Sequence, residues 1–457
     1  MTRPETQGEL LAALADFGSS LSARSLPPSV VAHAPYVMLD VVGTILGGST
    51  RSEVAALAST CHSVPDATIL RPGLPRTVHE LATVVNGTAA VWLELDPGHA
   101  RYRTHAPAHV LPAALATAEH LGVAGEDLIA AFVIGCEIAY RVGGALRPRP
   151  EVNAHGTWPI IGAAAAVARL HGLDSRTFAR ALGLSCHLAL AAAFRASVDG
   201  ATVRNAFVGV SGELAIRAVW LAKAGFTPLD APAVEIFGRI LGTSFEADRA
   251  AEGLGRRFEF TNDFVKFYAC CHHLYGAIEA VGEISEGEQL IPEDINEISV
   301  STYRHAAQFA TPAPSNELAA KFSLPFAVAA RIVRGNVGPD AFTHSALKDG
   351  RLRALATRVR VREDPALTAM YPQIQQANVE VLMKNGRRVS ATGFGHKGDG
   401  DLSPTSLRAR IEKFDGLAGA ALPAAATTLL RSRILEASSV GNVAHMFDDV
   451  RDVALRA

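Results

Sequence analysis

The sequence is short of cysteines, of aromatic residues and of net charge. Its 457 residues include 5 cysteines, aromatic side chains make up 6% of the chain, and the formal net charge is −2. A small, odd number of cysteines argues against a disulfide framework and favours a reducing compartment, so we expect a cytoplasmic protein. A net charge near zero provides no field to attract nucleic acid or anionic lipid. We therefore predict neither nucleic acid nor a membrane as a partner.

Signatures of secretion, membrane insertion and nucleotide binding are also missing. The N-terminus lacks the basic start and unbroken apolar run of a signal peptide, and no run of about eighteen apolar residues predicts a transmembrane helix. No G-x-x-x-x-G-K-[ST] motif, G-x-S-x-G motif or strand followed by G-x-G-x-x-G is present. These absences argue against the common nucleotide-binding folds and the α/β-hydrolases.

Alanine-rich apolar helical patterns dominate the first half of the chain. Hydrophobic residues make up 49% of the sequence, and with so few aromatics the core must come mainly from Ala, Leu and Val. Residues 30–48 are apolar on most faces, which predicts a buried helix. The short side chains of residues 162–168 would let two helix backbones approach closely. No convincing strand pattern occurs before about residue 262.

The pattern changes in the second half. Residues 295–305 and 358–364 alternate apolar and polar side chains as strands do. Residues 378–393 flank Asn385-Gly386, the dipeptide best suited to a type I′ hairpin turn. Helical patterns lie between these runs and return after them.

The chain therefore divides into two parts. We predict a mainly α fold, with a large all-helical domain and a smaller inserted α+β domain that acts as a lid. The predicted boundaries are 1–262 for the first part of the helical domain, 263–400 for the α+β domain and 401–457 for the C-terminal return.

The stretch from Asn86 to Pro112 holds the densest group of titratable side chains. Three imidazoles and two carboxylates fall within one polar interruption between helical runs, and such groups are costly to leave unpaired. Histidine titrates near neutral pH, so the stretch is suited to proton transfer. The alternative is a solvated loop whose charges pair with one another. The five residues are Glu94, Asp96, His99, His105 and His109.

Two further segments place polar groups just ahead of expected buried helices. His155 lies in residues 153–158 and Arg204 in residues 199–205. Helix N-termini attract anions, so these two side chains could help to receive a dicarboxylate. The alternatives are an ordinary capping role for Thr157 and a surface ion pair for Arg204.

Residues 266–280, KFYACCHHLYGAIEA, begin the smaller domain with a cluster of reactive side chains. The adjacent Cys-Cys and His-His pairs lack the spacing of zinc ligands, so we predict no metal site and keep zinc as a weaker alternative. Cys270 and Cys271 could be catalytic or simply packed and inert. Lys266 could bind a substrate carboxylate or be a surface lysine.

Nine segments, taken in order, resemble the MmgE/PrpD family, which includes 2-methylcitrate dehydratase, cis-aconitate decarboxylase and iminodisuccinate epimerase. The resemblance runs nearly end to end. The segments are LDVVGTILGG (39–48), NGTAAVWLELD (86–96), APAHVLPAALATAEHLG (106–122), IAAFVIGCEIAYRVG (129–143), GAAAAVARLHGLD (162–174), KFYACCHHLYGAIEAV (266–281), KFSLPFAVAARIVRG (321–335), EDPALTAMYP (363–372) and LSPTSLRARIEKF (402–414).

Several of the family's functional positions differ in this chain. The family's LDFDDTH reads LELDPGH at residues 93–99, so Glu94 matches its first acid and Asp96 its second, while the third acid and the threonine are replaced by Pro97 and Gly98. Its T-H-P-S histidine matches His105.

Further along, the histidine before the Gly/Ala helix falls at Asn153 or His155. The lysine of the family's G-T-x-x-K segment matches Arg204, and the histidine three residues later matches Phe207. The first lysine of the lid is kept as Lys266. The histidine that follows in the same motif is replaced by Tyr275, with His272 and His273 nearby.

The resemblance implies a homodimeric, cofactor-independent lyase, either a dehydratase or a decarboxylase, that moves a proton at carbon beside a carboxylate of a small di- or tricarboxylate. The alternatives are an isomerase, epimerase or tailoring enzyme on the same scaffold, and a silent ligand-binding member. His105 is the expected acid/base, oriented by Glu94 or Asp96. The expected catalytic residues are His105, Glu94, Asp96, His155 and His272, and the expected substrate-binding residues are Arg204, Lys266, His99 and Tyr275.

Overall fold

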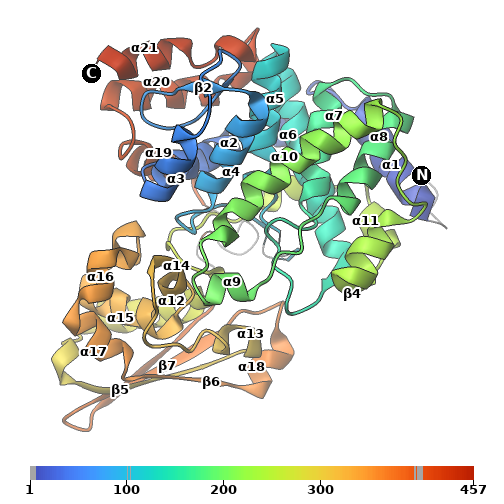
Figure 1. Cartoon of the computed structure of the whole chain (residues 1–457). Coiled ribbons are helices and arrows are strands. Elements are labelled where there is room, and N and C mark those ends of the chain that lie inside the picture. The colour runs from blue at the N-terminus through green and yellow to red at the C-terminus, as the bar shows by residue number, and fades with distance from the viewer. Residues whose placement is uncertain (1–6, 100, 103, 396–397, 399–404, 457) are drawn as a thin grey trace.

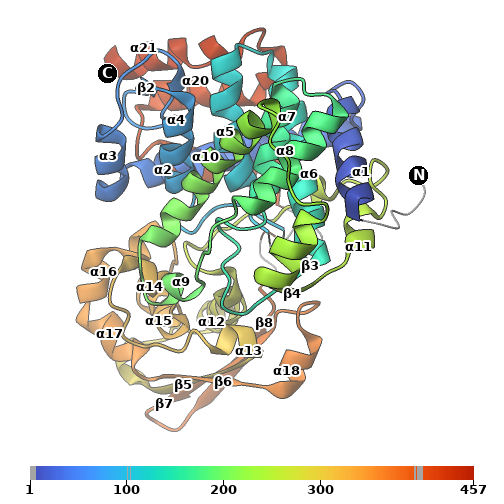
Figure 2. The same ribbon diagram turned by 45° about the vertical axis from the view of Figure 1, so that its right-hand side comes forward.

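A computed structural model describes residues 7–99, 101–102, 104–395, 398 and 405–456. The helices of the N-terminal half and of the C-terminal end gather on one side of the molecule, and the four-stranded sheet with its own helices forms the other side (Figure 1). The same division is visible after a 45° turn (Figure 2). The fold is therefore mainly α, with a large helical domain and a smaller α+β domain, as the sequence predicts.

Long apolar runs form the core helices of the helical domain. Helices α2 (Pro28–Ser49) and α6 (Gly125–Ala145) are long and apolar enough to cross a membrane, but 78% and 89% of their apolar windows are buried inside the fold. Helix α7 (Ile160–Leu170) crosses α6 closely, because a Cβ on Gly162 would lie only 2.3 Å from the carbonyl oxygen of Gly135. The predicted close approach of the small-residue run is confirmed.

The remaining helices surround this core. Helices α4 and α5 form an antiparallel pair, and α10 packs against α4, α5, α7 and α8. Their bounds are α1 Gln7–Ser20, α3 Ser52–Ser59, α4 His79–Ala90, α5 Ala106–Leu121, α8 Ser175–His187, α9 Arg195–Val198, α10 Val203–Lys223 and α11 Ala247–Ala251.

The helical domain also contains short strands that the sequence did not predict. Strands β1 (Ala67–Thr68) and β2 (Arg76–Thr77) pair antiparallel, as do β3 (Leu146–Pro148) and β4 (Gly242–Phe245). The expectation that no strand occurs before residue 262 is thus wrong. Pairs of this length are too short to produce a readable alternation of apolar and polar residues.

The α+β domain is built on one sheet with the order β6-β5-β7-β8. Strand β5 (Ile295–Thr302) runs parallel to β6 (Val359–Glu363) and antiparallel to β7 (Ala377–Met383), which forms a hairpin with β8 (Arg388–Gly393). Gly386 has a φ of 84° in the turn, as the Asn-Gly pair predicts.

Helices of this domain pack against the sheet. The strongest contacts are those of α12 with β7 and β8 and of α15 with β6. The bounds are α12 Tyr275–Gly287, α13 Arg304–Ala307, α14 Glu317–Lys321, α15 Leu324–Arg334, α16 His344–Lys348, α17 Gly350–Ala356 and α18 Pro365–Met370.

The chain then returns to the helical side. Helices α19 (Leu407–Ala418), α20 (Ala424–Leu435) and α21 (Asp448–Arg456) follow the sheet, and α19 and α20 pack against α2. The domain boundaries stay predictions, and the one between residues 400 and 401 lies outside the described residues.

One ion-paired group joins the two connections between the domains. Asp263 accepts hydrogen bonds of 2.8 and 3.0 Å from Arg410 of α19, and it lies 2.7 Å from the imidazole of His33 in α2. Burial alone would raise the pKa of Asp263, but the charges of Arg410 and His33 outweigh it and hold that pKa below its usual range. The first residue of the predicted α+β segment is therefore tied to the helix that follows that segment.

Candidate functional site

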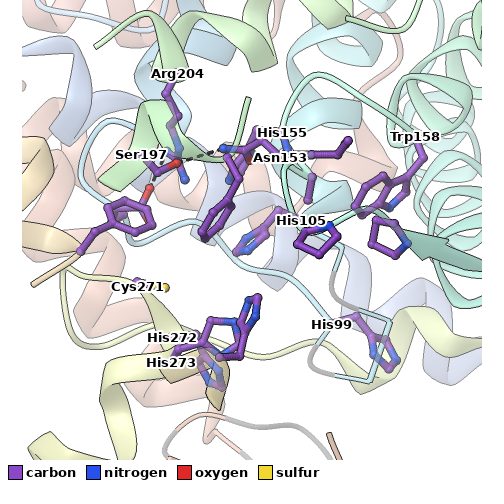
Figure 3. A pocket seen from close by; sticks show the side chains of 18 of the residues that line it. His99, His105, Asn153, His155, Trp158, Ser197, Arg204, Cys271, His272 and His273 are labelled. Atoms are coloured by element: carbon purple, nitrogen blue, oxygen red, sulfur yellow. Dashed lines mark hydrogen bonds and ion pairs between the residues drawn. The ribbon is translucent and has the colours of Figure 1, made fainter. Parts of the chain in front are cut away.

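A cavity of about 260 Å³ lies between the two domains (Figure 3). His105 and His155 stand on its helical-domain side, while His272 and His273 face them from the α+β domain. The helical domain also contributes Glu94, His99, Asn153, Trp158, Ser197 and Arg204, and the second domain contributes Phe264, Lys266, Cys271, His305, Phe322, Tyr371 and Gln375.

The acidic, histidine-rich stretch is buried, so the alternative of a solvated loop is wrong. Glu94, Asp96 and His99 are at most 3% exposed. Glu94 adopts a φ of 55°, which is uncommon for a residue with a side chain. Helix α5 begins at Ala106, so His109 belongs to this helix and not to the polar loop. The helix starts earlier than the run of apolar residues in the sequence suggests.

His105 and Asp96 form a close pair in the cavity wall. His105 Nδ1 lies 2.7 Å from Asp96 Oδ2, and Asp96 itself is fully buried beneath the lining. Burial would raise the pKa of Asp96, but the charges of His105 and Lys266 outweigh it and hold the pKa well below its usual range. Asp96 therefore stays ionised and can orient the imidazole of His105 through Nδ1. Nε2 is then the ring nitrogen of His105 that does not contact Asp96.

Glu94 joins the two cations that the sequence assigned to substrate. Its carboxylate forms an ion pair with Arg204 through Oε1 and accepts a 3.2 Å hydrogen bond from Lys266 Nζ through Oε2. All three side chains are at most 3% exposed, so the surface alternatives for both cations are wrong. Burial would lower the pKa of Lys266, but Glu94 and Asp96 outweigh it and raise that pKa.

This group carries no net charge. Lys266 Nζ also lies 4.0 Å from Asp96 Oδ1, so two carboxylates face one ammonium and one guanidinium. Arg204 stands over the ring of Phe322, with its central carbon 5.6 Å from the ring centroid. An anion that enters the cavity therefore meets cations whose charge Glu94 and Asp96 already balance.

His155 and His109 stack behind His105. The ring centroids of His155 and His109 are 5.3 Å apart, and His155 Nε2 lies 4.0 Å from Asp96 Oδ2. Burial and the positive charge of Arg204 lower the pKa of His155 well below its usual range. Burial also lowers the pKa of His109 to about 4. Both imidazoles are therefore neutral near neutral pH.

The tautomer of His109 follows from its two partners. Its Nδ1 lies 3.0 Å from the carbonyl oxygen of His105, and its Nε2 accepts a 3.2 Å hydrogen bond from the backbone N–H of Gly156. The proton must then sit on Nδ1, since Nε2 is the acceptor. His109 thereby links the start of α5 to the His155 segment.

The other predicted site residues differ in their placement. His99 lines the cavity but turns Nε2 toward Glu259, 3.5 Å away, and its hydrogen bond lowers the pKa of Glu259 to about 2. His272 lines the cavity and stacks on Phe264 at 4.7 Å. Tyr275 is fully buried outside the lining, and its hydroxyl donates to the carbonyl oxygen of Tyr268.

Tyr275 is therefore a structural residue and not a substrate contact. Its hydroxyl also accepts a 3.0 Å hydrogen bond from the backbone N–H of Tyr268, so both functions of the oxygen are used within the domain. Tyr275, which replaces the family's histidine, therefore lies in the core of the domain. The capping role considered for Thr157 is also wrong, because α7 begins at Ile160 and the hydroxyl of Thr157 donates to the carbonyl oxygen of Asn153.

Several residues that line the cavity were not among the predicted site residues. Asn153 donates to the hydroxyl of Ser197 at 2.9 Å, and Trp158 Nε1 donates to the hydroxyl of Thr104 at 3.1 Å. His305 follows strand β5 at its carboxyl end, which is a signal that the sequence did contain. Tyr371 lies in one of the segments that carry the family resemblance, and Gln375 follows it closely, but neither was predicted to be a site residue.

The two adjacent cysteines are not activated. Cys270 is fully buried, and burial raises its thiol pKa well above the usual range. Cys271 lines the cavity, and burial raises its pKa to about 12. Both thiols therefore remain protonated, which argues against a catalytic cysteine. His272 and His273 contact different partners, Phe264 and the hydroxyl of Tyr303, so the four side chains do not converge.

Asp96, His105 and His155 have the donor types of a metal site, with ligand atoms within 4.8 Å of one another. The 2.7 Å contact of His105 with Asp96 has the length of a hydrogen bond, and Lys266 already faces the second carboxylate oxygen. These three side chains alone could hold a cation, but the charge of Asp96 is already balanced by His105 and Lys266.

Two domains that face one another across a charged, imidazole-lined cavity form the typical arrangement of proteins that bind a small molecule at a domain interface. Residues 12–236 match the MmgE/PrpD N-terminal domain, and residues 268–436 match the MmgE/PrpD C-terminal domain. The chain belongs to the MmgE/PrpD family.

Curated relatives are similar at low identity. A cis-aconitate decarboxylase-like protein oryM of Aspergillus oryzae (strain ATCC 42149 / RIB 40) is 26% identical over 389 residues, which are 76% of this chain and 78% of that protein. A cis-aconitate decarboxylase of Aspergillus terreus (strain NIH 2624 / FGSC A1156) is 24% identical over 316 residues. The second match spans 64% of this chain and 63% of the relative, slightly less than two thirds of its length.

Proposed function

We propose that this protein is a lyase that decarboxylates or dehydrates a small di- or tricarboxylate without an organic cofactor. The observation that carries the proposal is the 2.7 Å contact between His105 Nδ1 and Asp96 in a cavity wall that Arg204 and Lys266 also line. An oriented imidazole supplies the proton transfer, and Arg204 and Lys266 supply N–H groups that can donate hydrogen bonds to a substrate carboxylate. Membership of the family and the decarboxylase relatives support this reaction class.

In a decarboxylation, the bond to the departing carboxylate breaks and its electron pair stays on carbon, next to the remaining conjugated carboxylate. Protonated His105 then delivers its proton to that carbon as carbon dioxide leaves. In a dehydration, His105 instead removes the proton beside a carboxylate, and a second group protonates the departing hydroxide. The low pKa of His155 makes it a poor proton donor, so we assign that second role to His272 across the cavity.

The α+β domain acts in this proposal as a lid that places His272 across the cavity from the helical domain. Arg204 and Lys266 hold the substrate carboxylate, and Glu94 sets their spacing by bridging them. His99 contributes a polar wall and Asp96 orients His105. We also propose a homodimer, which sedimentation velocity would test by a mass of twice 48.1 kDa.

The position of Glu94 also favours a second candidate function. Because its carboxylate already occupies both cations, a substrate with fewer free carboxylates, or one turned over by epimerisation, would fit the same group. The imidazole and phenol groups of His273, His305 and Tyr371 extend the cavity beyond the charged end and would contact a larger substrate. A silent ligand-binding member remains the alternative of a different class.

One experiment separates these outcomes. The protein is incubated in D₂O with a panel of di- and tricarboxylates, and proton NMR follows α-proton exchange, loss of carboxylate and new vinyl signals. Decarboxylation or dehydration products support the lyase, exchange without net conversion supports the isomerase, and binding without exchange supports the silent member. His105→Ala should lower any turnover by about 100- to 10,000-fold, whereas His62→Ala, at an exposed histidine, should leave it unchanged.

If His105→Ala retains turnover and its unfolding curve matches the parent protein, His105 is not the acid/base. Asp96→Asn is the companion variant. It keeps the shape of the side chain but removes the charge that orients the imidazole, so it should lower turnover less than His105→Ala and shift the pH profile.

A further inference from the structure

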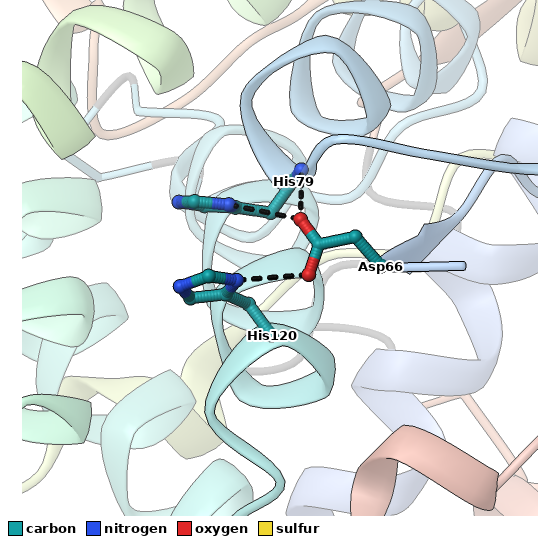
Figure 4. A group of neighbouring side chains, drawn as sticks. All are labelled: Asp66, His79 and His120. Atoms are coloured by element: carbon teal, nitrogen blue, oxygen red, sulfur yellow. Dashed lines mark hydrogen bonds and ion pairs between the residues drawn. The ribbon is translucent and has the colours of Figure 1, made fainter. Parts of the chain in front are cut away.

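A second group of metal-ligand side chains lies in the helical domain, away from the interdomain cavity (Figure 4). Asp66 precedes strand β1, His79 is the first residue of α4, and His120 lies in the last turn of α5. Each offers a ligand atom within 4.8 Å of the others. None of the three lines the cavity described above.

Asp66 is shared by the two histidines. His120 Nδ1 lies 2.8 Å from Asp66 Oδ1, and His79 Nδ1 lies 3.2 Å from Asp66 Oδ2. The imidazole rings stack, with centroids 4.0 Å apart and planes 22° apart. Figure 4 shows that both rings present the same edge to the carboxylate.

Glu80 brings a second carboxylate to the same nitrogen. Its Oε2 lies 3.3 Å from His79 Nδ1, which is already 3.2 Å from Asp66. An imidazole carries at most one proton at Nδ1, so it cannot give a full hydrogen bond to both acids. Two carboxylates that converge on one nitrogen repel each other unless a cation lies between them.

The separations of these donor atoms match those around a first-row metal ion. With metal–ligand bonds of about 2.0–2.2 Å, neighbouring ligands stand roughly 2.8–3.1 Å apart in octahedral geometry and roughly 3.3–3.6 Å apart in tetrahedral geometry. The distances of 2.8, 3.2 and 3.3 Å at Asp66, His79, His120 and Glu80 lie close to these ranges. Two imidazoles with a carboxylate suit zinc and its neighbours, and the nearby carboxylate of Glu80 adds a second negative charge.

We propose that Asp66, His79 and His120, with Glu80 beside His79, form a structural binding site for a divalent first-row transition-metal ion, with zinc the best match. The ion reaches the site from solvent, since the side chain of His120 is 41% exposed and that of Asp66 is 23% exposed. The guanidinium of Arg76 donates to the backbone carbonyl oxygen of Asp66, and the backbone N–H of His79 donates to Asp66 Oδ2 at 2.8 Å, which holds the carboxylate between the two rings.

The position of this site explains what an ion would do there. Helices α4 and α5 flank the segment of residues 91–105, which carries Glu94, Asp96 and His105. The ion would tie the start of α4 to the end of α5, at the far end of this helical pair. The 16 residues of α5 place it about 24 Å from His105, so its role is to hold the pair together and not to act on substrate.

Titration of the chelator-treated full-length protein with zinc chloride tests the site. Calorimetry should show one equivalent of zinc bound with micromolar or tighter affinity, and zinc should raise the melting temperature. His120→Ala should weaken binding by at least about 30-fold and abolish the temperature shift, because one of two imidazole ligands is lost. Glu80→Gln should weaken binding by about tenfold, and it serves if the His120 variant folds poorly.

His445→Ala is the matched control. His445 is an exposed histidine that lies 2.8 Å from Asp448 but has no second imidazole beside it among the described residues, so its loss should leave zinc binding unchanged. Cobalt(II) should give visible absorption bands with the parent protein and not with His120→Ala. The proposal is overturned if no stoichiometric zinc binds, or if the equivalent survives His120→Ala and disappears in His105→Ala, because the ion would then belong to the interdomain cavity.

Discussion

Two buried arginine–glutamate pairs in this molecule have the same composition and nearly the same burial but serve different ends. Arg141 and Glu137 lie within helix α6, and Arg204 and Glu94 lie in the wall of the interdomain cavity. Every one of these four side chains is at most 3% exposed. The difference lies in how completely their hydrogen-bonding groups are used.

The Arg141–Glu137 pair is fully satisfied. Arg141 Nε donates to Glu137 at 2.7 Å, and its terminal N–H groups donate to backbone carbonyl oxygens in residues 250–257. The second oxygen of Glu137 accepts from the backbone N–H groups of Glu259 and Phe260. Such a pair fixes the chain just before the α+β domain and leaves nothing for a ligand.

The Arg204–Glu94 pair is incomplete within the described residues. Arg204 Nε is buried without a hydrogen-bond acceptor, and so is Nδ1 of the neighbouring His155. Buried polar groups are rarely left this way in a purely structural network. The comparison shows that the Arg204–Glu94 pair keeps hydrogen-bonding capacity that faces the cavity, whereas the Arg141–Glu137 pair keeps none.

The largest loss of stability should follow Arg141→Met. The variant leaves Glu137 buried without its only cationic partner among the described side chains, which should cost about 3–5 kcal/mol of unfolding free energy. Urea denaturation would measure it. Arg195→Met removes an exposed i,i+4 pair with Asp199 and should cost less than about 1 kcal/mol. Equal losses in the two variants would contradict the structural role of Arg141.

Acid should expose the contribution of His109. Its pKa is about 4 in the folded protein against 6.5 for a free side chain, so between these values the unfolded chain binds a proton that the native protein does not. Its stabilising effect is complete above pH 6.5 and is lost as the pH falls toward 4, by up to about 3 kcal/mol. His109→Gln should therefore show a shallower fall of melting temperature across this interval. Parallel curves for the two proteins would argue against a neutral His109.

Arg204→Met should cost less stability than Arg141→Met but more activity. Lys266 remains 3.2 Å from Glu94 and still balances its charge, so the expected loss is about 1–2 kcal/mol. Turnover or α-proton exchange should nevertheless fall by about 100-fold, because a carboxylate-binding cation is gone. A stability loss as large as that of Arg141→Met, with unchanged exchange, would remove Arg204 from the site.

The smallest effect should come from Cys271→Ala. The thiol lines the cavity, but its pKa of about 12 keeps it protonated at neutral pH. Exchange rates in D₂O should stay within about twofold of the parent protein, since no thiolate takes part. A loss of tenfold or more would mean that Cys271 acts in the reaction.

Sequence patterns predicted the elements whose periodicity is long and whose turn chemistry is strict. The buried helix at residues 30–48 and the hairpin at Asn385-Gly386 are examples, since each depends on neighbours in the chain. The two-residue strands β1 and β2 could not be predicted, because their pairing depends on packing around α4 and α5.

Local sequence patterns also predicted only part of the candidate site. The density of acids and histidines marked the stretch around Glu94 and His105, because charge and titration are properties of composition. Which atoms face the cavity depends on how the two domains meet. Tyr275 therefore turned out to bond within its own domain, and His305 and Tyr371 entered the lining from segments distant in the sequence.

The junction of His33, Asp263 and Arg410 ties the segment that leads into the α+β domain to helices α2 and α19 of the helical domain. Rotation about such a point displaces each side chain in proportion to its distance from it. A rotation of the α+β domain about this junction would scarcely shift Lys266, three residues beyond Asp263, and would move α13 and α18 further, since they lie far from α19 in Figure 1. Such a rotation would therefore keep the ammonium of Lys266 close to Glu94.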